Sequence, residues 1–137
     1  MLSKFTVAAT IAVSLVFAGT AFAGKTTSSS SIAGPYLVGT SSPTGAAAVA
    51  PQFGQAITFN VSTTATSNPF VNLNCYQDSV LVMNSWSAFF PGGTNQSFGL
   101  YSPSWRSGAA SCTADLGMLT SNGKWKVLAS TSFDVNA

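Results

Sequence analysis

Apolar and polar residues alternate along several stretches of the chain from Gln55 onward. Residues 57–61 have the sequence Ile-Thr-Phe-Asn-Val, and the same period of two runs through residues 71–75, 110–116 and 127–135. Successive side chains of a β-strand point to opposite faces of a sheet, so this period places one set in a core and the other toward water. We therefore predict four half-buried strands in these stretches.

Three shorter apolar runs predict weaker strands, at residues 36–38, 80–83 and 98–101. Between the runs lie turn-forming sequences such as Pro91-Gly92-Gly93 and Ser121-Asn122-Gly123. No window shows an amphipathic helix with caps. Seven short strands at this spacing are typical of an all-β protein in which two sheets pack as a sandwich.

The first 23 residues have the three parts of a secretory signal peptide. Lys4 supplies the positive start, residues 7–18 are apolar, and Ala21-Phe22-Ala23 matches an A-x-A cleavage site. The apolar run is shorter than the roughly 20 residues that span a membrane, so we expect cleavage after Ala23 rather than a retained anchor. The chain is then expected to be secreted and free of the membrane, or periplasmic if its source is Gram-negative.

The remainder of the chain is expected to form one domain. Residues 24–35 are rich in Ser and Thr and predict a flexible leader. Residues 36–137 have a length that suits a single core. Residues 41–51 carry small residues between two prolines and predict a loop, with one helical turn at residues 46–50 as the alternative.

The chain has two cysteines, Cys75 and Cys112, and both lie in the predicted domain. An exported chain meets an oxidising compartment, so we expect one disulfide rather than two buried thiols. The alternation places Cys75 on the same face as Leu73, and Cys112 on the same face as Ala114, so both sulfurs point into the core. The bridge would join two neighbouring strands or the two sheets.

The strand pattern and one segment resemble an immunoglobulin-like or fibronectin type III-like domain of bacterial exported proteins. The segment is Phe98-x-Leu100-x-x-Pro103-x-Trp105-x-Ser107-Gly108-x-Ala110-x-Cys112, which is similar to the family's passage from strand E into strand F. The resemblance covers roughly residues 36–135 and implies a seven-stranded Ig-like β-sandwich with strands A, B, C, C′, E, F and G. The cysteines then fall on C and F, which are neighbours in one sheet. A second placement puts Cys75 on strand B, at the cost of too few strands between Trp86 and Cys112.

Charged side chains are scarce. Five Lys or Arg and three Asp are the only ones among 137 residues, and there is no His and no Glu. A Ser-His-Asp triad, paired Glu acids and His metal sites are therefore excluded. We predict no enzyme, no catalytic residue, no metal site and no cofactor. The formal net charge of +2 is also too small for capture of nucleic acid.

Two of the acidic residues are expected on water-facing sides of strands. Asp115 and Asp134 fall on F and G, which the resemblance places side by side, and Lys126 is also on G. An exposed charge pair is the expected arrangement, and a Ca²⁺ site built on the two carboxylates is the alternative.

The candidate binding residues are aromatic side chains near predicted loops, together with polar residues on one strand face. Trp and Tyr beside amides and hydroxyls stack on sugar rings and are also common in protein-binding loops. The alternative is that the aromatic residues cover the ends of the core. The candidate surface consists of Trp86, Phe89, Phe90, Tyr101, Trp105, Asn72, Asn74 and Tyr76.

We therefore expect a secreted, non-catalytic binding or adhesion module at or outside the cell surface, with a protein or glycan partner. Low charge gives little repulsion between copies and allows self-association, so a structural subunit of an extracellular fibre, coat or matrix is the alternative. A small-ligand carrier or inhibitor is a second alternative, because the chain is also similar in size and composition to antibiotic carriers of the neocarzinostatin type.

Overall fold

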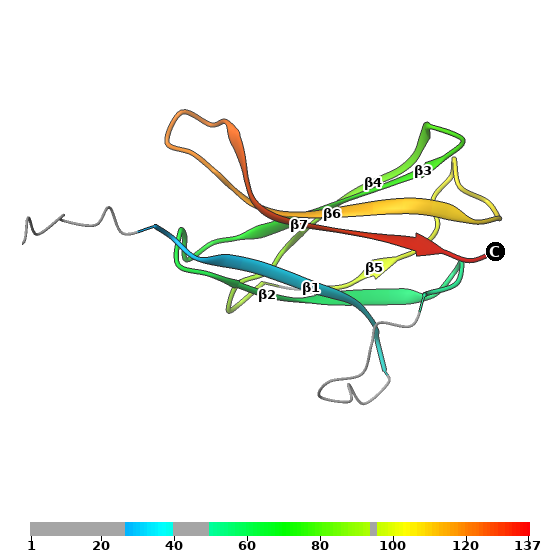
Figure 1. The fold of residues 1–137 in the computed structure, drawn as a ribbon, viewed down its shortest axis with the longest axis horizontal. Helices are drawn as coiled ribbons and strands as arrows, with labels where there is room; N and C mark the ends of the chain where they lie inside the picture. The colour runs from blue at the N-terminus through cyan, green and yellow to red at the C-terminus, as the bar shows by residue number, and fades with distance from the viewer. Residues whose placement is uncertain (1–26, 40–49, 94–95) are drawn as a thin grey trace, which may run out of the picture.

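The chain folds into two antiparallel β-sheets that lie one above the other (Figure 1). The computed structural model describes residues 27–39, 50–93 and 96–137, so the predicted signal peptide and most of the predicted loop lie outside the described residues. The strands are β1 (Ser30–Leu37), β2 (Ala56–Thr63), β3 (Phe70–Gln77), β4 (Val80–Ala88), β5 (Phe98–Gly99), β6 (Ala110–Leu119) and β7 (Trp125–Val135). The prediction of an all-β fold with two sheets is confirmed. In the described ranges, no helix has the length and apolar character needed to cross a membrane.

The two sheets differ in size. The smaller sheet has the order β1-β2-β5 and the larger sheet has the order β4-β3-β6-β7. β3 and β6 are far apart in the sequence, yet they are neighbours at the centre of the larger sheet. β4 and β7 form its edges, and β7 also contacts β1 of the smaller sheet.

The predicted disulfide joins the two central strands of the larger sheet. Cys75 of β3 and Cys112 of β6 are direct partners in the strand register, with an S–S distance of 2.01 Å and a Cα–Cα distance of 4.1 Å. Both residues are buried. The predicted disulfide is confirmed, and it links neighbouring strands rather than the two sheets.

The core lies between the sheets and is filled by the side chains that alternate inward. It includes Ile57, Phe59 and Phe98 of the smaller sheet and Val71, Leu73, Leu116 and Val135 of the larger sheet. Trp105, in the segment between β5 and β6, is fully buried among them. Its indole N–H donates a hydrogen bond to the Gly108 carbonyl at 3.0 Å, so this polar group is satisfied inside the core.

β1 begins earlier than the sequence pattern predicts. It starts at Ser30, inside the segment expected to be a flexible leader, and runs through Gly34-Pro35. Its first four residues pair with β2, and Ile32 packs against the core. The strand register shifts between Ala33 and Tyr36, so the chain passes the proline without leaving the sheet. Residues 30–35 therefore belong to a strand of the fold.

The larger sheet is bent by two irregularities in its register. One lies between Cys75 and Tyr76 where β3 pairs with β4, and the other lies between Leu116 and Gly117 where β6 pairs with β7. An extra residue of this kind bends a strand and increases its twist. In Figure 1 the β3–β4 and β6–β7 hairpins rise at opposite ends of the sheet. The face that points away from the smaller sheet is therefore concave.

Candidate binding surface

The side chains that point away from the core form an ordered surface on the larger sheet, which we call the outer face. Because the strands pair in register, its residues stand in three rows that cross all four strands. The first row is Trp86, Asn72, Asp115 and Ser130; the second is Asn84, Asn74, Thr113 and Ser132; the third is Leu81, Tyr76, Ser111 and Asp134. Polar residues thus occupy the middle of the face.

A chain of hydrogen bonds holds the amide groups of the first two rows. The Asn74 amide donates to Oδ1 of Asn72 at 2.6 Å, and the Asn84 amide donates to Oδ1 of Asn74 at 2.6 Å. The indole N–H of Trp86 donates to Oδ1 of Asn84 at 3.2 Å. Asn72, at the end of this chain, is only 4% exposed. The amides are therefore fixed in orientation before any ligand arrives.

Each carboxylate of the outer face accepts a hydrogen bond from a serine on the neighbouring strand. Ser130 Oγ donates to Asp115 Oδ1 at 2.5 Å, and Ser111 Oγ donates to Asp134 Oδ1 at 3.0 Å. These hydrogen bonds use one oxygen of each carboxylate. A carboxylate can accept further hydrogen bonds on its other oxygen, so both groups can also bind hydroxyl donors.

Two tryptophans meet at one end of the outer face. The rings of Trp86 on β4 and Trp125 on β7 have centroids 4.6 Å apart and stand nearly perpendicular, at 78°. To reach β4, the Trp125 ring lies over Gly117 of β6: a Cβ atom at Gly117 would stand 2.7 Å from Cη2 of that ring. Trp86 remains 50% exposed. One indole is therefore presented to solvent while the other supports it.

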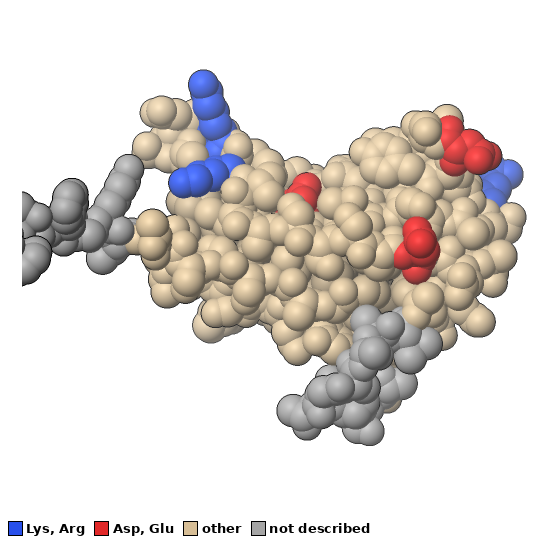
Figure 2. All heavy atoms as spheres, in the orientation of Figure 1, with Lys and Arg blue, Asp and Glu red and all other residues tan. Residues whose placement is uncertain are grey.

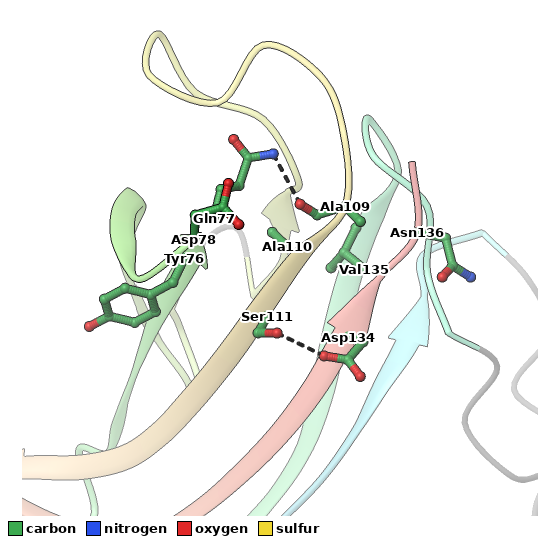
Figure 3. Close-up of a pocket in the computed structure, with 9 residues that line it drawn as sticks. All are labelled: Tyr76, Gln77, Asp78, Ala109, Ala110, Ser111, Asp134, Val135 and Asn136. Atoms are coloured by element: carbon green, nitrogen blue, oxygen red, sulfur yellow. Dashed lines mark hydrogen bonds between the residues drawn. The ribbon is translucent and has the colours of Figure 1, made fainter.

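The opposite end of the outer face carries an open pocket of about 420 Å³ (Figure 3). Tyr76, Ser111 and Asp134 of the third row contribute to its lining. Gln77 closes one side, because its amide donates to the carbonyls of Ser107 at 2.8 Å and Ala109 at 3.0 Å. A smaller hollow of about 300 Å³ shares the three third-row residues and extends toward the second row. The polar middle of the face is thus continuous with this pocket.

Charged side chains are sparse over the molecular surface, and the surface is hollowed between the two raised hairpin ends (Figure 2). Lys124 and Lys126 lie at the β6–β7 hairpin, and Asp78 lies in the β3–β4 turn. The three rows of the outer face contain no Lys or Arg. Their charge therefore comes from Asp115 and Asp134 alone.

Asp115 and Asp134 lie on the neighbouring strands β6 and β7, as expected, but they do not face each other. Asp115 is opposite Ser130 and Asp134 is opposite Ser111, so the two carboxylates lie in different rows. Lys126 is opposite Met118. In an antiparallel pair, each step forward along one strand corresponds to a step backward along the other. Two residues on neighbouring strands therefore face each other only if the register makes them partners. In the described part of the chain, no three His, Cys, Asp or Glu side chains come together as metal ligands.

Only part of the candidate surface predicted from sequence is brought together. The outer face contains Trp86, Tyr76, Asn74 and Asn72, of which Asn72 is almost completely buried. Phe89 is buried and stacks on Phe98 with ring centroids 6.1 Å apart.

The other predicted aromatic residues lie away from the three rows. Trp105 is fully buried in the core. Phe90 is half-buried and meets Phe70 edge-on, with ring centroids 5.7 Å apart. Tyr101 is 63% exposed and packs over Gly99 of β5. Phe89 and Trp105 therefore follow the alternative prediction, in which aromatic side chains cover the core.

Sequence reasoning missed Trp125, Asn84 and the two serines that hold the carboxylates. Trp125 lies between Lys124 and Lys126, which is typical of a solvated hairpin end. The signal that could have found it is Gly117, which leaves a gap on the outer face of the partner strand. Asn84 lies after residues 80–83, where the predicted strand ends, and it joins the outer face because β4 continues to Ala88.

The comparisons with known proteins return no relative. No family model matches the chain, and no curated protein or solved structure matches it. The function is therefore argued from the outer face itself.

Proposed function

We propose that this chain is a secreted, non-catalytic binding module that works at or outside the cell surface and engages its partner through the outer face. The absence of His and Glu from the sequence supports a non-catalytic role, because the usual acid–base groups are missing. The buried disulfide supports an oxidising compartment, where such bonds form and persist.

The strand order supports an Ig-like or fibronectin type III-like architecture. With β1 to β7 labelled A, B, C, C′, E, F and G, the sheets have the orders A-B-E and C′-C-F-G. Domains of this kind present binding surfaces on a rigid sandwich. Fold alone does not specify a function, so the binding role depends on the site.

The observation that carries the proposal is the exposed Trp86 ring beside a preorganised polar surface. An exposed Trp is expensive to keep in water, and rigid aromatic side chains contribute much of the binding energy at interfaces. Here the ring is supported by Trp125 and tied by its N–H to Asn84, so little conformational entropy is lost on binding.

Co-sedimentation with isolated cell-surface material of the producing organism tests this proposal. Purified protein with its disulfide intact should bind, and Trp86→Ala should bind at least about tenfold more weakly, since truncation of an aromatic hot-spot residue costs about 2 kcal/mol or more. Tyr101→Ala is the matched control, because Tyr101 is exposed but lies off the outer face. Absence of binding by the wild type, or equal losses in the two variants, would refute the proposal.

A second candidate function, a subunit of an extracellular assembly, is favoured by the β4 edge. β4 is an edge strand of nine residues that contains no charged residue and no proline, and Val80 and Leu81 at its start are exposed. Edge strands usually carry such residues to prevent strand-to-strand pairing. Sedimentation velocity over a concentration series tests it: association that Leu81→Lys abolishes would favour this function, and a monomer at every concentration would exclude it.

A further inference from the structure

The outer face has a polar middle and exposed apolar side chains at its two ends. Nine residues of the three rows are Asn, Ser, Thr or Asp, whereas the exposed apolar side chains stand at the ends: Trp86, Leu119 and Val127 at one, and Tyr76 and Leu81 at the other. Protein–protein interfaces have the opposite arrangement, with a dry apolar centre and a polar rim. The partner of this face therefore has to satisfy hydrogen bonds along its middle.

We propose that the outer face binds a neutral polysaccharide chain, with one sugar ring stacked on Trp86 and the following hydroxyl groups bound by the amides and carboxylates of the rows. This inference rests on the proposed function and names its ligand class. The assignment follows from three properties of the face, namely its charge, its aromatic platform and its hydrogen-bonding groups.

Charge complementarity selects a neutral polymer over an acidic one. Asp115 and Asp134 are the charged residues of the three rows, and no cation stands beside them in those rows. A polymer that carries carboxylate, sulfate or phosphate groups would place like charges against these carboxylates, which is unfavourable. Lys124 and Lys126 flank Trp125 near the β6–β7 turn and lie outside the three rows.

The tryptophan pair provides a platform for a sugar ring. The face of an indole carries partial negative charge, so it attracts the partly positive C–H groups of a pyranose ring. Trp125 meets Trp86 nearly at a right angle, so it supports that ring without covering it completely. Trp86 is 50% exposed as a result.

The rows supply both donors and acceptors at a regular spacing. Neighbouring strands are about 4.8 Å apart, so side chains across a row repeat at that distance over four strands. The hydroxyls of Thr113 and Ser132 lie 3.2 Å apart in the second row, and Asp115 and Asp134 lie in the rows on either side. Sugar hydroxyls both donate and accept hydrogen bonds, which is the capacity that this surface requires.

The experiment determines whether the bound material is a neutral or an acidic polysaccharide. Surface material of the producing organism is digested with protease and passed over an anion exchanger, which yields a neutral and an acidic polysaccharide fraction. Binding of each fraction is measured by titration of tryptophan fluorescence, with linear neutral glucan and mannan oligosaccharides and polygalacturonate as defined probes. We expect binding of the neutral fraction and of at least one neutral oligosaccharide, with a change in the emission of the exposed indoles.

Two variants test the assigned residues. Trp86→Ala should weaken binding of the neutral fraction by about tenfold or more and remove most of the fluorescence change, while emission of the buried Trp105 remains. Asn84→Ala removes an exposed amide and should weaken binding by about threefold or more, the loss expected for one hydrogen bond. Tyr101→Ala is the control and should bind as the wild type does.

The outcomes distinguish this inference from the proposed function. Two results would overturn the neutral polysaccharide as the ligand and leave the proposed binding function in place. One is binding to intact surface material that depends on Trp86 but is lost on protease digestion. The other is binding to the acidic fraction. Absence of binding to any surface material would overturn both. Binding of the neutral fraction that Trp86→Ala and Asn84→Ala leave unchanged would overturn the assignment of the outer face.

Discussion

Gly117 determines how the two tryptophans of the outer face meet. It stands on β6 between Trp86 of β4 and Trp125 of β7, and the Trp125 ring occupies the space where a side chain would be. A Cβ atom there would also lie 2.6 Å from the Lys126 carbonyl oxygen, which belongs to the backbone and cannot swing aside. The packing of Trp86 against Trp125 therefore depends on the absence of a side chain at Gly117.

Replacing Gly117 by Ala should disturb both stability and the tryptophan pair. We expect a loss of about 1–3 kcal/mol, the usual cost of forcing an extra methyl group into a packed site. Urea denaturation measures the free energy of unfolding, and far-ultraviolet circular dichroism reports the exciton signal of the paired indoles, which should weaken. Thr113→Ala, on the same strand and face, is the control and should change the unfolding free energy by less than about 1 kcal/mol. An unchanged exciton signal in Gly117→Ala would contradict this account.

Ser79 occupies a backbone conformation that favours glycine. Asp78 and Ser79 form the two-residue turn between β3 and β4, with φ angles of 48° and 66°. Turns with positive φ at both central residues favour Asn or Asp followed by Gly. Ser79→Gly should therefore raise the unfolding free energy by about 0.5–1 kcal/mol, because it removes the left-handed strain at a smaller entropic cost. Ser79→Ala, which lacks that freedom, should not stabilise the protein. A gain with Ala as large as with Gly would show that the strain is elsewhere.

At the scale of the strands, the disulfide connects the central pair of the larger sheet. β3 and β6 are separated by 37 residues at their cysteines, so the bond restricts a long loop of the unfolded chain. Closing a loop of this length contributes about 3–4 kcal/mol in the chain-entropy model. The bridge lies under the outer face and holds together the two strands that carry most of its polar residues.

Removal of the disulfide by Cys75→Ala and Cys112→Ala together should lower the unfolding free energy by about 3–4 kcal/mol. Denaturant titration of the oxidised wild type and the variant measures the difference. Each single substitution breaks the same bond, so either one should cost nearly as much as the pair. Losses that simply add would indicate that side-chain packing, and not the bridge, supplies the stability.

The strands that the sequence pattern locates best are those with one apolar and one polar face. β2, β3, β6 and β7 follow the period of two because their inner residues face the core. β4 is longer than its apolar start because its later inward positions are Ser85 and Ser87, which break the pattern. The start of β1 is hard to predict because it is rich in Ser and contains Gly34-Pro35, a sequence that does not favour a strand. Pairing with β2 holds this segment in the sheet despite its local sequence.

The outer face is harder to predict than the strands because its arrangement depends on the register between them. Alternation places Asn72, Asn74 and Tyr76 on an outer face, but it cannot show that Trp86 is opposite Asn72. The meeting of Trp86 and Trp125 requires the order of four strands and the gap at Gly117. The burial of Trp105 requires a loop path between β5 and β6 that no periodicity describes.

At the scale of the whole molecule, the low charge predicts how the proposed binding responds to salt. The cations of the described chain lie at Lys124, Lys126 and Arg106, all outside the three rows of the outer face. Binding that depends on ion pairs or on released counterions weakens steeply as salt rises, whereas stacking and neutral hydrogen bonds are affected little.

The affinity for the neutral surface fraction should therefore change by less than about twofold between about 0.05 M and about 0.5 M NaCl, a range over which the Debye length falls about threefold. Fluorescence titration at each salt concentration measures it. Replacement of Lys124 and Lys126 by Gln should leave both the affinity and its salt response unchanged, because both lysines lie outside the three rows. A steep decline with salt that these substitutions abolish would move the binding site from the polar rows to the β6–β7 hairpin. The partner would then be an anion that the charge of the outer face disfavours.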